Sequence, residues 1–136
     1  VTEIWAETVT AATGSQTWNI RYTNDAGTAA RQTGAVGIGA APTLGRCWQL
    51  PLQAGDKGAS LIENVTGGTG TVGTANIMVL KPLLDIRIPI ANSGEVWDYL
   101  RTGMSTLYAD SALYALIMAD STSSGVPDAQ FDIVNG

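Results

Sequence analysis

Alternating hydrophobic and polar positions recur along most of the chain and predict a protein built largely from β-strands. In residues 16–23, Trp18, Ile20 and Tyr22 alternate with polar neighbours, which is the period-two pattern of a strand with one buried face. The same pattern predicts strands at residues 2–10, 28–38, 46–53, 59–66 and 75–90. Turn sequences such as Asn24-Asp25-Ala26-Gly27 separate them. We therefore expect about six strands, the first two paired as an N-terminal hairpin.

The hydrophobic period lengthens in the last third of the chain, where helices are predicted. Leu84, Ile86, Ile88 and Ile90 still alternate as in a strand, which stops at Asn92-Ser93. Ser93 is a suitable helix N-cap, and Glu95 suits the positive end of the helix dipole. The apolar residues that follow share helical spacing: Val96, Leu100, Met104, Leu107 and Tyr108. A further apolar run at 112–118 completes a prediction of two helices within residues 94–118.

Strands followed by helices indicate an α+β fold, with an antiparallel sheet covered on one face by helices. The 136 residues are predicted to form one domain, made of a hairpin (1–23), a sheet (28–90) and the helices (94–118). Residues 65–74 fit neither period and are expected to form a long loop rich in glycine. No Gly-Lys-Ser/Thr sequence closes that loop, which excludes a phosphate-binding loop.

The composition is unusually poor in charge. Charged residues make up 14% of the chain, against roughly 25% in an average domain, and hydrophobic residues make up 45%. Such a neutral surface is expected either to be covered by other copies or to be kept hydrated by Thr, Ser, Asn, Gln and Gly. The net charge of −5 argues against general nucleic-acid affinity. No signal peptide or membrane-spanning run is expected.

The residues needed for common catalytic mechanisms are missing. The chain has no histidine, which excludes Ser-His-Asp and Cys-His catalysis and most zinc sites. An acid-dependent hydrolase would need two converging carboxylates, and no spacing indicates such a pair. Cys47 is interpreted as a small buried strand residue rather than a reactive thiol, and it has no partner for an internal disulfide. We expect no enzymatic activity, cofactor or metal.

One stretch resembles a known family. Arg87-Ile88-Pro89-Ile90-Ala91-Asn92-Ser93, followed by an acidic helix start, resembles the levivirus-type coat proteins of small single-stranded RNA bacteriophages. The segment Tyr99-Leu100-Arg101-Thr102 and the short run 113–117 fall where that family has its two C-terminal helices. The resemblance covers about residues 83–118. It implies intertwined homodimers, in which each subunit's helices lie over the partner's sheet.

The resemblance also implies a function and a location. The chain would be a virion capsid protein that is assembled in the cytoplasm of a bacterial host, as an icosahedral shell around single-stranded RNA, without a membrane. The dimer interface would comprise the residues of the predicted helices: Val96, Trp97, Leu100, Met104, Leu107, Tyr108 and Leu113. The glycine-rich loop, with Gly67, Gly68, Gly70 and Gly73, would contact neighbouring dimers.

The RNA-facing residues follow from the parity of the last predicted strand. If Leu84 and Ile86 face the helices, the opposite face carries Lys81, Asp85 and Arg87, and the second strand can add Asn19 and Arg21. The alternative is that these are ordinary solvated strand residues. Lys81 and Leu83 stand where better-known coat proteins carry a Tyr and an Asn that bind an operator hairpin, so any operator binding would use other residues. The alternative function is a β-rich phage decoration or accessory module that binds protein surfaces without packaging RNA.

Overall fold

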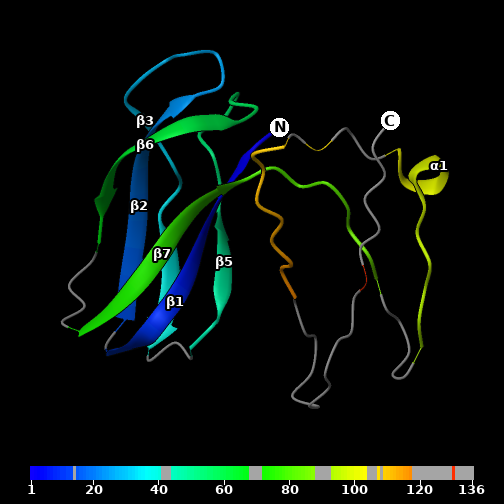
Figure 1. Ribbon diagram of the computed structural model, residues 1–136. Coiled ribbons are helices and arrows are strands. Elements are labelled where there is room, and N and C mark those ends of the chain that lie inside the picture. Colours follow the sequence, from blue (N-terminus) through cyan, green and yellow to red (C-terminus); the bar gives the residue numbers. More distant parts are fainter. Residues whose placement is uncertain are drawn as a thin grey trace.

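The computed structural model describes residues 1–13, 15–40, 44–67, 72–87, 93–103, 107, 109–117 and 130. The elements, in chain order, are β1 (Glu3–Thr13), β2 (Ser15–Asn24), β3 (Arg31–Gln32), β4 (Val36–Ala40), β5 (Cys47–Leu50), β6 (Ala59–Thr66), β7 (Val72–Leu80) and α1 (Tyr99–Thr102). All strand pairs are antiparallel and form two sheets that face each other (Figure 1). The described fold is therefore a β-sandwich, not the expected α+β arrangement.

Each sheet is organised around one of the two long N-terminal strands. In the first sheet, β1 lies between β5 and β7. In the second, β2 pairs with β3, β4 and β6. β3 and β6 flank β2 from opposite sides, because Tyr22 of β2 pairs with Arg31 in β3 and with Ile62 in β6.

The expected N-terminal hairpin does not form, although both of its strands do. β1 and β2 follow each other in the chain but lie in different sheets, so their apolar faces meet across the sandwich. The alternating pattern correctly predicts which side chains of a strand are buried. It carries no information about whether the next strand lies beside it or opposite it.

The core lies between the sheets and is small. Its buried hydrophobic residues come from both layers: Ile4, Ala6, Trp18, Ile20, Tyr22, Leu50 and Ala59. The indole rings of Trp18 and Trp48 meet edge to face across the layers, with ring centroids 6.3 Å apart. Aromatic pairs favour this geometry. Trp18 belongs to the buried core, and Trp48 is partly buried against it.

The predicted strand at 28–38 is split into β3 and β4 by Thr33 and Gly34. The backbone amide of Thr33 donates to the carbonyl of Ile20, and its buried hydroxyl accepts from the Ile20 amide. The hydroxyl of Thr33 thus takes the place of a backbone carbonyl as the acceptor for the Ile20 amide. A Cβ at Gly34 would lie 3.0 Å from the Pro51 ring, so glycine permits this close approach.

The last strand is shorter than predicted. β7 ends at Leu80, and Leu84 and Ile86 are exposed on a segment without strand pairing. Two causes are visible in the sequence. Leu80 pairs with Glu3, where β1 begins, so hardly any of β1 remains to pair beyond it. Pro82 also lacks the amide hydrogen that a ladder requires. Ile88 and Ile90 lie outside the described residues.

The prediction of two C-terminal helices is wrong for the described residues. α1 covers a single turn and stops at Gly103, whose φ of 59° is left-handed, and residues 111–117 contain no helix. Helices in proteins depend on packing of their apolar face. Here Val96 and Leu100 are 84% and 88% exposed, so the apolar face has no surface to pack on. The feature that most strongly suggested a coat protein is therefore absent from this part of the chain.

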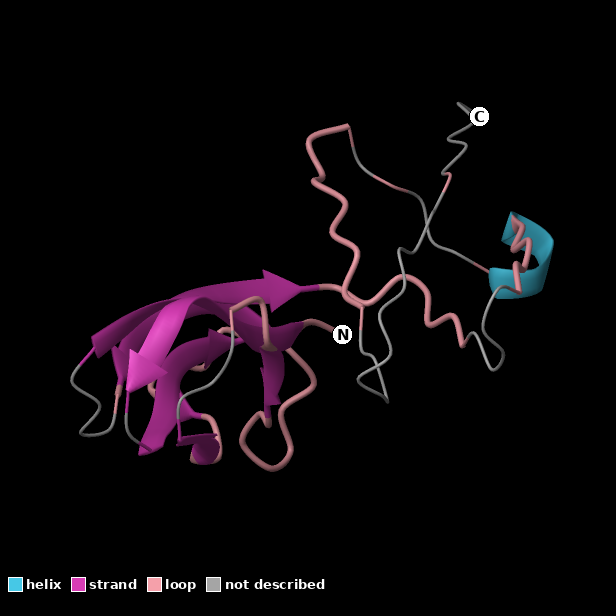
Figure 2. Ribbon diagram, turned by 90° about the horizontal axis from the view of Figure 1, so that it is seen from below, coloured by secondary structure: helices cyan, strands magenta, loops and turns pink. Residues whose placement is uncertain are grey.

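Figure 1 shows the chain beyond β7 leaving the sandwich, with α1 on the far side from the start of β7, and in Figure 2 α1 likewise stands apart from the strands. We call residues 81–117, as far as they are described, the C-terminal segment. Among the described helices, none is long and apolar enough to cross a membrane.

Candidate functional site

The most highly connected polar group is a set of four side chains, which we call the Asp56 cluster: Asp56, Arg31, Tyr22 and Asn24. The Asp56 carboxylate accepts from the Tyr22 hydroxyl (2.6 Å), from Arg31 Nε (2.9 Å) and from Asn24 Nδ2 (2.9 Å). The Tyr22 hydroxyl in turn accepts from the Gln53 amide at 2.8 Å. These bonds join the end of β2 to β3 and to the loop before β6.

The electrostatics of the cluster indicate a structural role. The hydrogen bond from Arg31, followed by that from Tyr22, holds the pKa of the Asp56 carboxyl well below its ordinary range. Burial, and then the bond to Asp56, raises the pKa of the Tyr22 hydroxyl. Only 3% of the Asp56 side chain is exposed, and its oxygens are already engaged. A carboxylate that stays ionised at neutral pH and whose two oxygens already accept hydrogen bonds suits neither general acid catalysis nor metal binding.

This cluster predicts a specific pH dependence of stability. The pKa of Asp56 is lower in the folded chain than its unfolded value of about 3.9. Its contribution is therefore fully present above pH 4 and is lost as the pH falls through the folded pKa. Asp56→Asn should be less stable at neutral pH and lose less further stability below pH 4. Urea unfolding of wild type and Asp56→Asn between pH 7 and pH 2 measures this difference. If the free energies of unfolding of the two proteins changed in parallel with pH, the prediction would be wrong.

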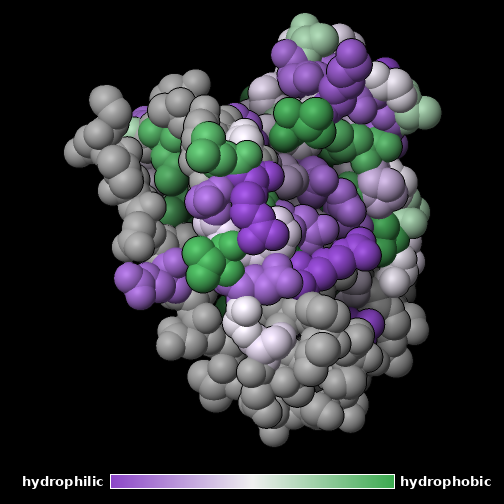
Figure 3. Space-filling model, turned by 90° about the vertical axis from the view of Figure 1, so that its right-hand side faces the viewer, coloured by the Kyte–Doolittle hydropathy of each residue, from purple (hydrophilic) through white to green (hydrophobic). Residues whose placement is uncertain are grey.

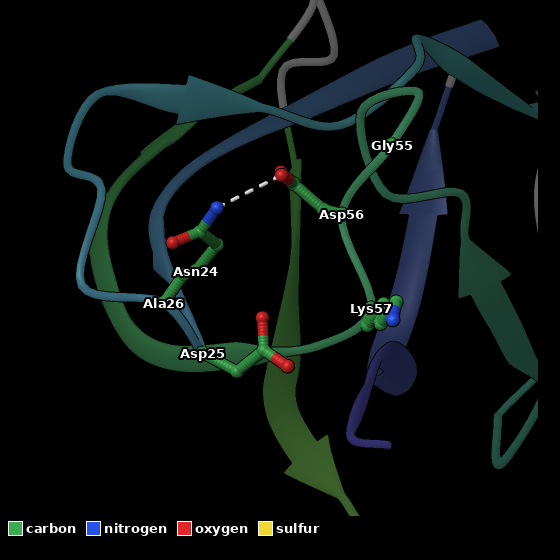
Figure 4. A pocket seen from close by; sticks show the side chains of 6 residues that line it. All are labelled: Asn24, Asp25, Ala26, Gly55, Asp56 and Lys57. Atoms are coloured by element: carbon green, nitrogen blue, oxygen red, sulfur yellow. Dashed lines mark hydrogen bonds between the residues drawn. The ribbon is translucent and has the colours of Figure 1, made fainter.

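A recess beside the Asp56 cluster has few side chains that could act in catalysis or bind a ligand. It encloses about 320 Å³ and is lined by Asn24, Asp25, Ala26, Gly55, Asp56 and Lys57 (Figure 4). Asn24 and Asp56 are bonded to each other, which leaves one carboxylate, Asp25, and one ammonium, Lys57. No group of acidic, cysteine or histidine side chains that could hold a metal ion occurs among the described residues. The recess therefore supports neither hydrolysis nor a metal site.

The predicted RNA-binding residues fall into two separate groups. Asn19 and Arg21 lie on β2 in the second sheet, where Asn19 donates to the Thr33 carbonyl and Arg21 pairs with Glu63 at 2.9 Å. Lys81, Asp85 and Arg87 are exposed on the C-terminal segment, which continues from β7 of the first sheet. RNA binding by either group stays a prediction.

The C-terminal segment is the most distinctive surface of the molecule. Of the 13 large hydrophobic side chains that are exposed in the described chain, seven belong to it: Leu84, Ile86, Val96, Leu100, Leu113, Tyr114 and Ile117. In Figure 3, which views the molecule from the side of this segment, apolar groups stand between polar ones. Single exposed hydrophobic residues are ordinary, whereas large contiguous apolar patches are typical of interaction surfaces.

The predicted dimer-interface residues lie on this segment in varied surroundings. Val96, Leu100 and Leu113 are exposed, and Trp97 and Leu107 are half-buried. Met104 and Tyr108 lie outside the described residues. Of the predicted loop glycines, Gly67 and Gly73 flank the β6–β7 connection, and Gly68 and Gly70 lie outside the described residues.

Local interactions keep α1 formed despite its isolation from the core. The Arg101 amide donates to the Asp98 carboxylate at 2.8 Å, and the Arg101 guanidinium donates to the Val96 carbonyl at 3.0 Å. The same guanidinium lies 4.9 Å from the centre of the Trp97 ring, within cation–π range. Arg101 thus links α1 to the residues just before it, and both Val96, before α1, and Leu100, on it, remain exposed.

One part of the segment returns to the sandwich. The Tyr114 hydroxyl interacts with Glu7 of β1, and burial, followed by the charge of Glu7, raises the pKa of that phenol. Burial also raises the pKa of Cys47, on the neighbouring strand β5. A raised thiol pKa lowers the thiolate fraction and supports the prediction that Cys47 is not a reactive nucleophile.

The Asp56 cluster was not predicted from the sequence. Its members are distant in sequence and carry no motif, and Asn24 stands in a predicted turn. The Trp97–Arg101 contact could have been found, because residues four apart share a face of a helical turn. Comparisons of the chain with protein-family models, curated proteins and solved structures return no match.

Proposed function

We propose that this chain is a non-enzymatic structural subunit, a β-sandwich module that assembles with further copies of itself through its C-terminal segment. The observation that carries the proposal is the contrast between a closed sandwich core and a segment whose large apolar side chains are exposed. Burying such side chains between copies is favourable by about 1.5–3 kcal/mol for each one fully buried.

The backbone of the segment supports the same proposal. Residues 82–87 form no backbone hydrogen bond with other described residues and do not belong to a sheet. An extended chain with free amides and carbonyls can pair with a partner as well as cover it. The low charge content of 14% agrees with a surface that is partly covered in an assembly.

A second candidate is a capsid subunit that also packages RNA. It is favoured by Lys81 and Arg87, which are exposed and form no ion pair among the described residues. In this candidate the phosphate contacts would make particle formation sensitive to salt.

Expressing the chain alone and imaging it by electron microscopy, before and after nuclease treatment, tests both candidates. Regular particles that persist after nuclease treatment and contain no nucleic acid are expected for the structural module. Particles that protect RNA would favour the second candidate. Dispersed monomers without any particle would contradict both.

A further inference from the structure

The recess beside the Asp56 cluster carries two charges of opposite sign that are not paired with each other. Asp25 and Lys57 both line it and are exposed, and neither side chain forms an ion pair or a hydrogen bond within the part of the chain that the structure describes. In Figure 4 the Asp25 carboxylate is directed into the space between the two turns that enclose the recess, and Lys57 lies across from it. Each of these charges is therefore free to bind a ligand group of the opposite sign.

The other polar side chains of the recess are already engaged. Asn24, which is buried, donates to Asp56 at 2.9 Å and accepts from the Thr28 amide at 2.8 Å. The Asp56 carboxylate is held by the rest of the Asp56 cluster. A ligand in the recess would therefore meet Asp25 and Lys57 as its two free charged side chains.

The two turns that enclose the recess are fixed by contacts of the folded chain. The Asp25 amide donates to the Gly58 carbonyl at 3.1 Å and so ties the first turn to the second. Gly27 and Gly55 stand at left-handed positions of these turns, with φ of 81° and 91°. A Cβ at Gly58 would lie 2.7 Å from Thr2 Oγ1, so the second turn packs closely on the start of the chain. Because little of the recess has to become ordered on binding, even a small ligand can be held there.

We propose that this recess binds a small zwitterion of the free α-amino acid class, with the ligand's ammonium group on Asp25 and its carboxylate on Lys57. The volume of about 320 Å³ is at the lower end of ligand-sized pockets and suits a molecule of that size. A ligand with a single charge would pair with one of the two side chains and leave the other unpaired. The site uses no residue of the C-terminal segment, so binding there is independent of self-assembly.

Saturation-transfer difference NMR of the full chain tests for this ligand, because it observes the protons of a weakly bound small molecule on a subunit or on a large assembly alike. The probe is serine. Ethanolamine and 3-hydroxypropanoate are its matched controls, since each is serine without one of its two charged groups. Serine should bind with a Kd of about 1–10 mM, which is ordinary for so small a ligand. Each control compound should bind about two- to fivefold more weakly.

Three variants test the two charged side chains. Asp25→Asn and Lys57→Gln each remove one charge at an exposed position and should weaken serine binding about two- to fivefold. Lys57→Glu makes both charges negative, so this variant should bind ethanolamine more tightly than serine, the reverse of wild type. The matched controls are Asp85→Asn and Lys81→Gln, at exposed positions of the C-terminal segment, and both should bind serine like wild type.

The contradicting results are equally specific. No saturable serine signal up to about 100 mM, or equal binding of all three compounds, would overturn the proposed site. Serine binding that is unchanged in both Asp25→Asn and Lys57→Gln would place the ligand elsewhere and overturn it too. Circular dichroism verifies the fold of each variant. None of these results bears on self-assembly, so the proposed function is tested separately.

Discussion

Tyr22→Ala should lower the free energy of unfolding by about 3–5 kcal/mol, the largest effect expected for a single substitution in this chain. The Tyr22 side chain is fully buried and belongs to the core of the sandwich. Its removal leaves a cavity that the surrounding strands can fill only in part. Since small domains have a stability of only about 5–15 kcal/mol, the variant should be partly unfolded at 37 °C. Urea unfolding followed by tryptophan fluorescence measures the change.

Tyr22→Phe separates the hydroxyl from the ring. The ring still fills the core, but Asp56 loses one donor and the Gln53 amide loses its acceptor. Leaving buried polar groups unpaired costs about 1–3 kcal/mol, so this variant should lie between Tyr22→Ala and wild type. Thr17→Ala, at an exposed position on the same strand, is the control and should change stability by less than about 0.5 kcal/mol. Equal stability of Tyr22→Phe and wild type would show that the hydrogen bonds of the Tyr22 hydroxyl in the Asp56 cluster do not stabilise the fold.

A chain ending at Leu80 should keep its fold and lose all self-association. Among the residues that the structure describes, every buried hydrophobic residue lies at or before Ala59, and the partly buried residues that pack on this core end at Ile77. The truncation therefore removes no core side chain of the described chain, although it exposes the surface around Glu7 that Tyr114 contacts. Cooperative thermal unfolding together with a monomer mass is the expected result. An unfolded truncated chain would show that the C-terminal segment belongs to the folding unit itself.

The strands could be predicted from the sequence because their pattern is local. In β2, the alternation of Trp18, Ile20 and Tyr22 with polar residues predicts the buried face correctly. Which strands become neighbours depends on contacts between distant residues, such as Ile4 with Val79, and no local pattern encodes those. The prediction of an N-terminal hairpin is wrong for this reason, because β1 and β2 lie in different sheets.

The helices could not be predicted correctly, because spacing alone does not stabilise a helix. Val96 and Leu100 have the spacing of an apolar face, but that face is helical only when it packs on something. In the described chain nothing covers it, and Gly103 ends the turn. The candidate site was likewise predicted in part. Val96, Leu100 and Leu113 were expected at an interface, and all of them are exposed apolar residues, but the Asp56 cluster joins residues that only the folded sandwich brings together.

The central claim is that the exposed apolar segment serves self-assembly. Sedimentation equilibrium of the purified full chain over a wide range of concentrations tests it most directly, since this method gives mass independently of shape. The account predicts masses that are multiples of the 14.1 kDa subunit and that decrease on dilution. A mass of 14.1 kDa at every concentration would contradict it.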